Sequence, residues 1–110
     1  MTQLPKSIFD LLELEDFRLR TAMYLGEKKI CVLRAFIDGY FYATDTHNLK
    51  LIDDKRFLKF NDWTALHFGW RESTAGWKNI ILDECNRDEE KAVDKFFEVY
   101  DKFIADTKTP

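Results

Sequence analysis

The chain has 110 residues, of which 45% are apolar and 34% are charged, and its net charge is −3. This length favours a single domain over residues 1–110, and the apolar content excludes a disordered chain. The acidic balance disfavours a nucleic-acid-binding protein, which would need a basic face in spite of the net charge.

The first predicted helix runs from about Pro5 to Asp16, because proline suits the first turn of a helix. Its apolar stripe consists of Ile8, Phe9, Leu11 and Leu12. Its acidic flank consists of Asp10, Glu13, Glu15 and Asp16. The first residues hold no apolar signal-peptide core, and no apolar run approaches the ~20 residues that cross a bilayer. We therefore expect a cytoplasmic protein without a membrane partner.

A short connection ends near Gly26, and a second helix is predicted from about Lys28 to Thr46. Apolar residues recur there at three and four positions, which is typical of a central, amphipathic helix: Ile30, Leu33, Phe36, Ile37, Tyr40 and Phe41. Gly39 interrupts this pattern and costs about 1 kcal/mol against alanine, so we expect close packing around it. Asn48 is a plausible end of the helix.

Apolar and polar residues do not alternate regularly over residues 49–59, so we interpret this segment as a loop that can hold a short strand at 49–52. A third helix is expected to begin at Asn61 or Asp62, either of which can cap it, and to end at Gly69. Ser73 or Thr74 is expected to cap a fourth helix, which reaches Cys85.

The last predicted helix spans about Asp88 to Asp106, and its apolar pattern is the clearest in the chain. Asn86 and Glu89 have the spacing of a capping box before it. The apolar positions are Ala92, Val93, Phe96, Phe97, Tyr100, Phe103 and Ile104. Five helices with short connections predict an all-α bundle.

Metal and cofactor chemistry finds little support in the sequence. His47 and His67 have no HExxH spacing, and Cys31 and Cys85 have no CxxC partner. Two cysteines allow one disulfide, but we expect two free, buried thiols in a reducing compartment. Four isolated glycines make no phosphate-binding loop, so we predict no metal, no cofactor and no small-molecule substrate.

Catalytic interpretations of the polar residues compete with structural ones. Ser73 lacks the GxSxG elbow of a nucleophile, and a helix cap explains it. The doublets Asp53–Asp54 and Asp83–Glu84 are adjacent residues that diverge on a helix. Asp38 lies within an apolar helix, where a structural hydrogen bond or an exposed face is the simpler explanation. An enzyme would have to combine Asp38 with His47 or His67.

The three tryptophans, Trp63, Trp70 and Trp77, are spaced seven residues apart. A base-stacking platform normally lies in a positive groove, and the charge around these residues is mixed. Core packing is the better interpretation, with one exposed tryptophan as an alternative interface anchor.

Two acidic clusters are the candidate partner-binding residues. The first includes Asp10, Glu13 and Asp16, and the second includes Asp83 and Glu84. Asp88, Glu89 and Glu90 extend the second cluster and complement the dipole of the last helix. An ordinary solvated surface is the simpler interpretation of both clusters, and a binding surface for a basic protein is the alternative.

Two stretches resemble small bacterial immunity proteins of contact-dependent growth inhibition and polymorphic toxin systems. They are AMYLGEKKICVLRAFIDGYFYA (residues 22–43) and FNDWTALHFGWRESTAGWKNIILDECNRDEEKAVDKFFEVYDKF (residues 60–103). The resemblance implies an antitoxin that blocks the C-terminal domain of a cognate toxin by binding it. Many such toxin domains are nucleases with basic surfaces, which an acidic inhibitor would complement.

The leading hypothesis is therefore a non-enzymatic immunity protein that acts by stoichiometric protein–protein contact. The alternative is a small regulatory adaptor or structural module that binds another protein and has no toxin partner. A compact enzyme and a nucleic-acid-binding protein remain as further hypotheses.

Overall fold

A computed structural model describes residues 8–46 and 54–107, which form α-helices and no strand. The segment proposed as a strand, residues 49–52, lies outside the described residues, as do His47 and Asn48. The helices are α1 (Ile8–Leu12), α2 (Glu15–Leu19), α3 (Thr21–Leu25), α4 (Ile30–Thr46), α5 (Asp54–Phe57), α6 (Phe60–His67), α7 (Gly76–Glu84) and α8 (Glu89–Thr107). The all-α prediction is confirmed, with more helical segments than the five predicted.

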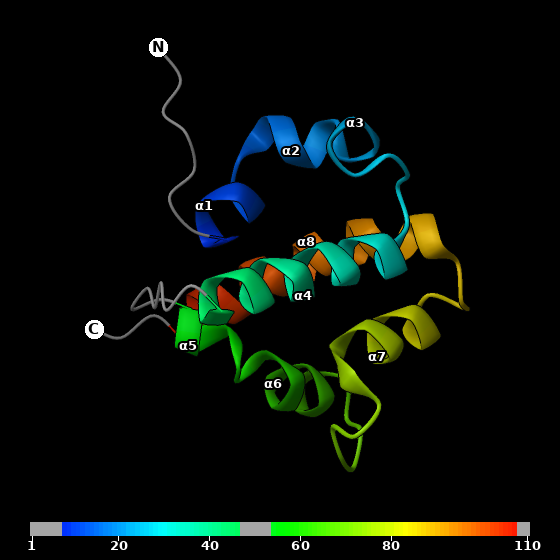
Figure 1. Cartoon of the computed structure of the whole chain (residues 1–110). Helices are drawn as coiled ribbons and strands as arrows, with labels where there is room; N and C mark the ends of the chain where they lie inside the picture. Colours follow the sequence, from blue (N-terminus) through cyan, green and yellow to red (C-terminus); the bar gives the residue numbers. More distant parts are fainter. Residues whose placement is uncertain (1–7, 47–53, 108–110) are drawn as a thin grey trace.

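The two long helices, α4 and α8, form the centre of the molecule (Figure 1). Helices α1 to α3 lie on one side of this pair, and α6 and α7 lie on the other. Within the described residues, none of the helices combines the length and the apolar character needed to cross a bilayer.

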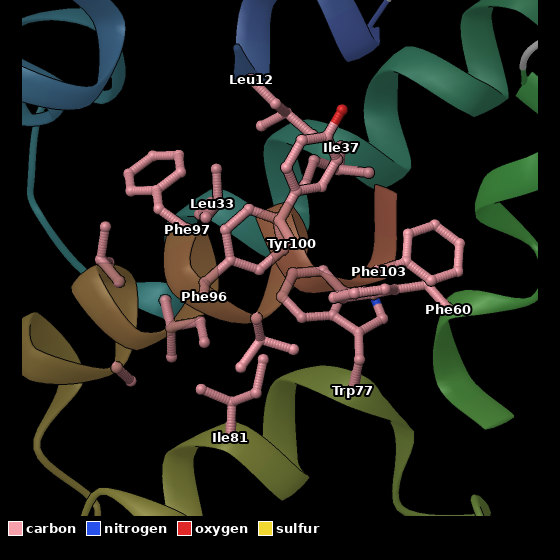
Figure 2. Close-up of a cluster of buried hydrophobic side chains, with 14 of the residues drawn as sticks. Leu12, Leu33, Ile37, Phe60, Trp77, Ile81, Phe96, Phe97, Tyr100 and Phe103 are labelled. Carbon is pink, nitrogen blue, oxygen red and sulfur yellow. The ribbon is translucent and has the colours of Figure 1, made fainter. Parts of the chain in front are cut away.

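The core is built from the inward face of α8 and the helices around it (Figure 2). Phe96, Tyr100 and Phe103 are fully buried, and the rings of Phe60 and Phe103 meet edge to face at 5.0 Å. Trp77 from α7 packs on Phe96 at 4.9 Å between ring centroids. Each such side chain contributes roughly 1.5–3 kcal/mol by leaving water, so α8 stabilises the whole bundle.

The N-terminal region differs from the single helix predicted for residues 5–16. Helix α1 ends at Leu12, Leu14 is extended (φ −74°, ψ 120°), and α2 then begins at Glu15. Leu12 and Phe17 are both fully buried. On one straight helix they would point about 140° apart, so the chain breaks between them to bury both. The connection expected before Gly26 is also helical, as α2 and α3.

Helix α4 begins close to the predicted position and buries Ile30, Leu33 and Ile37. The prediction of close packing at Gly39 is wrong, because Gly39 is exposed and a Cβ atom there would meet nothing within 4 Å. Phe36, which the periodicity placed on the apolar stripe, is 40% exposed.

The caps predicted for α6 and α7 are wrong. Helix α6 begins at Phe60 without a side-chain cap, and α7 follows Ala75, which also gives none. Instead, Asn61 Oδ1 accepts the backbone N–H of Trp77 at 2.8 Å, so a residue of α6 caps α7. The Ser73 hydroxyl donates to the Asp62 carboxylate, which ties the connecting loop to α6.

The junction between α7 and α8 uses left-handed residues and not the predicted capping box. Asn86 and Arg87 have φ angles of 55° and 62°. Asp88 is the cap of α8, because its Oδ1 accepts the Lys91 N–H at 3.0 Å. The extent predicted for this helix, and its buried apolar face, are confirmed.

Candidate functional site

The first predicted acidic cluster lies on α1, α2 and the bend between them. Asp10, Glu13 and Asp16 are all exposed. Glu13 Oε2 accepts the Tyr100 hydroxyl at 2.9 Å, and Asp16 Oδ2 accepts the Tyr24 hydroxyl at 2.7 Å. Asp16 also lies 3.4 Å from Arg20 Nε. The carboxylates of Glu13 and Asp16 therefore hold parts of the fold together, whatever else they bind.

The second predicted cluster lies at the C-terminal end of α7. Asp83 forms an ion pair with Arg87, and Glu84 accepts the Trp70 indole N–H at 3.0 Å. Carboxylates are unfavourable at a helix C-terminus, and these two partners offset that cost.

The five predicted residues do not form one surface. Helix α2 and helix α7 lie on opposite sides of the central α4–α8 pair (Figure 1). A single partner domain that contacts one cluster would have to wrap around the bundle to reach the other.

An apolar surface on the α1–α3 side was missed by the sequence analysis. Leu19 is 75% exposed and Met23 is 76% exposed, although both are large apolar side chains. The residues of this α2–α3 surface are Asp16, Leu19, Arg20, Met23, Tyr24 and Phe36. The region had been predicted as a connection, so no helical face was assigned to it.

A shallow depression of about 200 Å³ lies within the α2–α3 surface, lined by Asp16, Arg20, Met23 and Tyr24. The Tyr24 hydroxyl donates to Asp16, and this hydrogen bond raises the pKa of Tyr24. The lining therefore combines the apolar Met23 side chain and the Tyr24 ring with a carboxylate and a guanidinium. Such a mixture is common at the centres and rims of protein interfaces.

The α2–α3 surface is fixed to the core by ring packing and by hydrogen bonds to α8. Phe17 is fully buried beneath it, and its ring centroid is 5.2 Å from that of Tyr24 and 6.1 Å from that of Phe97. Arg18 donates two hydrogen bonds to Asp101 on α8, at 2.7 and 2.8 Å, and a third to the Leu12 carbonyl at 2.7 Å. A partner would therefore meet a preformed surface, which reduces the ordering cost of binding.

Two other hollows lie elsewhere in the described part of the chain. One, of about 100 Å³, is polar and lies between α4 and the start of α7, with Arg34, Asp38 and Lys78 in its lining. The other, of about 270 Å³, is a shallow groove beside α6 that includes Leu66 and Trp70. Leu66 is 79% exposed, but the groove has fewer exposed large apolar side chains than the α2–α3 surface.

Two of the residues considered for catalysis, Asp38 and His67, have structural partners. Asp38 is exposed and its Oδ2 lies 2.7 Å from Arg34 Nε. His67 stacks on Trp63, with ring centroids 4.9 Å apart and an angle of 10° between the planes. The described residues contain no cluster of three metal-ligating side chains.

The cysteines are free, as predicted, but the prediction that they are buried is wrong for both. Cys31 is exposed, and its Sγ lies 3.0 Å from Glu89 Oε2, which raises the pKa of the thiol. Cys85 is half-buried, and that burial raises its pKa.

The core interpretation of the tryptophans holds fully for Trp77, which is buried. Trp63 and Trp70 are half-buried, and their indole N–H groups donate to Asp106 at 2.7 Å and to Glu84 at 3.0 Å. All three therefore have structural partners.

Comparison of the chain with protein-family models, with curated proteins and with solved structures finds no match.

Proposed function

We propose that this chain is an immunity protein that neutralises a bacterial toxin domain by stoichiometric binding in the cytoplasm, with the α2–α3 surface as its contact. The observation that carries the proposal is the exposure of Leu19, the last residue of α2, and of Met23 in α3, each of which is about three-quarters exposed. Burying such a side chain contributes roughly 1.5–3 kcal/mol before the costs of association.

The composition of this surface supports a protein partner. Arg20 and Tyr24 are of the residue types that dominate binding energy in protein interfaces, and they border the depression. Phe36 extends the apolar area onto α4. Inhibition needs no reacting group, because a protein that covers a toxin's active site blocks it by exclusion.

The charge around the surface favours a basic partner. Asp10, Glu13, Glu15 and Asp16 lie on α1, α2 and the bend between them, and the net charge of the chain is −3. Arg18 on the same helix is neutralised by its ion pair with Asp101. A nuclease toxin that binds phosphate through lysines and arginines would be attracted to this side.

The resemblance to immunity proteins includes this region, since residues 22–43 hold Met23, Tyr24 and Phe36. The resemblance supports the class of partner, and the exposed apolar side chains support the place of contact. A protein-binding adaptor without a toxin partner would use the same surface.

The first test is co-expression with the C-terminal domain of the open reading frame immediately upstream, scoring growth and co-purification. We expect the domain to be toxic alone, and this chain to restore growth and form a one-to-one complex. Toxicity without rescue and without binding, or no toxicity at all, would favour the adaptor hypothesis.

The contact surface is tested by the double variant Leu19→Asp/Met23→Asp, which should lose both rescue and binding. The matched control is Leu58→Asp, because Leu58 is 74% exposed but lies between α5 and α6. Both variants change exposed side chains, so circular dichroism should show unchanged helix content. Full rescue by the double variant would exclude the α2–α3 surface as the toxin contact.

A further inference from the structure

We propose that Arg18 and Asp101 are positioning residues, which hold the α2–α3 surface in one arrangement relative to α8. Neither of them belongs to the contact residues of that surface. Their effect on binding rests on the proposed function, but the arrangement that they hold can be measured on the chain alone.

The helices that carry the surface are too short to be stable by themselves. Helices α2 and α3 have five residues each, and neither begins with a capping side chain. Isolated helices shorter than about 12–15 residues are marginal in water. The positions of α2 and α3 therefore depend on contacts with the rest of the chain.

Phe17 gives α2 its first anchor, because it is the buried residue of that helix. Its ring meets the Phe97 ring of α8 edge to face, with centroids 6.1 Å apart. One ring fixes how deeply the helix lies but does not prevent the helix from turning about that contact. Any such turn would move Leu19 of α2 away from its place beside Met23 and Tyr24 of α3.

Arg18 gives α2 a second anchor, about 100° further around the helix. Its two terminal nitrogens donate to the two carboxylate oxygens of Asp101 on α8, at 2.7 and 2.8 Å. Its Nε donates at 2.7 Å to the carbonyl of Leu12, the last residue of α1. One side chain therefore joins α1, α2 and α8, and two anchors on different sides of α2 stop it from turning.

The shape of the guanidinium matters here as well as its charge. Its donors lie in one rigid plane, so Arg18 reaches Leu12 and both oxygens of Asp101 at the same time. Its central carbon also lies 5.0 Å from the ring centroid of Phe97. A lysine would keep the charge, but its single nitrogen cannot make all of these contacts.

A second ion pair supplies a matched control. Lys28 Nζ lies 2.9 Å from Asp94 Oδ1, and Asp94 lies about two turns before Asp101 on α8. The Lys28 and Asp94 side chains are 29% and 66% exposed, against 24% and 56% for Arg18 and Asp101. Lys28 lies between α3 and α4, so this pair does not anchor α2. Replacing either aspartate with alanine removes one negative charge from the same helix.

The first test is amide hydrogen exchange of the chain alone, measured at the Arg20 N–H, which donates to the Asp16 carbonyl at 2.9 Å. Asp101→Ala should exchange there at least about threefold faster than Asp94→Ala, because losing an anchor opens α2 locally. The amides of the buried residues of α8 should exchange alike in the two variants. Equal exchange at Arg20, or an equal acceleration along α8, would overturn the proposal.

Two further variants separate position from charge. Asp101→Glu keeps two carboxylate oxygens for the guanidinium and should restore slow exchange at Arg20. Arg18→Lys keeps the positive charge and loses the planar set of donors, so it should exchange like Asp101→Ala. Wild-type exchange in Arg18→Lys would show that charge alone holds α2, and it would contradict the positioning role of the guanidinium.

The second test is binding of the C-terminal domain of the upstream open reading frame to the two alanine variants. Asp101→Ala should bind it at least about threefold more weakly than Asp94→Ala, because a loosened surface must be ordered on binding. Both variants remove the same charge, so electrostatic steering does not produce this difference. Equal affinities, for a domain whose binding Leu19→Asp/Met23→Asp abolishes, would show that the anchor does not control binding.

The two proposals fail in different ways. A domain that does not bind the wild-type chain would refute the immunity function. The exchange measurement needs no partner, so it still decides whether Arg18 and Asp101 position the surface.

Discussion

Tyr100 joins the aromatic core to a charged side chain, the carboxylate of Glu13. Its side chain is fully buried, and its hydroxyl donates at 2.9 Å to Glu13, which lies 87 positions earlier in the chain. Burial raises the pKa of Tyr100, and the negative charge of Glu13 and the hydrogen bond to it raise the pKa further. The tyrosine therefore stays protonated in the folded chain at pH values where an unfolded tyrosine ionises.

The pH dependence of stability follows from this shift. Above about pH 10 the unfolded chain loses the Tyr100 proton and the folded chain keeps it, so the free energy of unfolding falls. We expect a contribution of about 1.4 kcal/mol per pH unit from this group, present in wild type and absent in Tyr100→Phe. Chemical denaturation between pH 8 and about pH 11 measures it.

Tyr24→Phe is the control, because the exposed Tyr24 hydroxyl donates to Asp16 at the surface and should contribute much less to the slope. Equal slopes for wild type and Tyr100→Phe would show that Tyr100 does not keep its proton on folding.

At the scale of the elements, Asn61 of α6 supplies the side-chain cap at the start of α7. It lies in the first turn of α6, and its Oδ1 accepts the first free N–H of α7, that of Trp77. Helix α7 has no capping side chain of its own, since Ala75 precedes it. The packing of α6 on α7 and the start of α7 are therefore coupled.

The change Asn61→Ala should lower the free energy of unfolding by about 1 kcal/mol, the usual cost of losing a helix cap. Asn61→Asp should retain stability, because its carboxylate can accept the same N–H and also favours the positive end of the helix. Urea denaturation of the three chains tests this, and a loss as large in Asn61→Asp as in Asn61→Ala would contradict the capping role.

The sequence predicts best those helices whose own apolar periodicity determines which face is buried. Helix α8 has a regular apolar face that is buried along its length, so its extent was predicted closely. One helix was predicted from Pro5 to Asp16, across the break near Glu13, because no glycine or proline marks that break. That break exists because Leu12 and Phe17 must both reach the core, which is a property of the assembled bundle.

The same limit applies to the candidate site. Asp16 was predicted, and it lies on the rim of the α2–α3 surface. Leu19 and Met23 were missed, because an apolar residue in a short helix looks in sequence like any core residue. Only the assembled structure, in which both side chains are about three-quarters exposed, shows that they face outward.

At the scale of the whole molecule, the two predicted acidic clusters lie on separate sides of the α4–α8 pair, and only the α1–α3 side carries the proposed contact. Glu15→Lys should therefore slow association with the toxin domain severalfold, with little change in dissociation. This change leaves the Glu13–Tyr100 and Asp16–Tyr24 hydrogen bonds in place. Asp83→Lys, on the α7 side, should leave the association rate unchanged.

Stopped-flow measurements at low and high salt test this prediction, because steering by charge weakens as salt increases. If both variants associate at the wild-type rate, neither acidic cluster steers the partner. If Asp83→Lys alone is slow, the contact lies on the α7 side.

The position of α8 has a consequence for synthesis on the ribosome. Helix α8 follows every helix that it buries, and it supplies Phe96, Tyr100 and Phe103 at the centre of the core. The apolar faces of the earlier helices therefore leave the ribosome before their covering exists, and they stay open to chaperones or to aggregation in the meantime. A chain built in this order completes the α2–α3 surface only when α8 has joined the bundle, so the proposed binding of a toxin domain would begin only at that point.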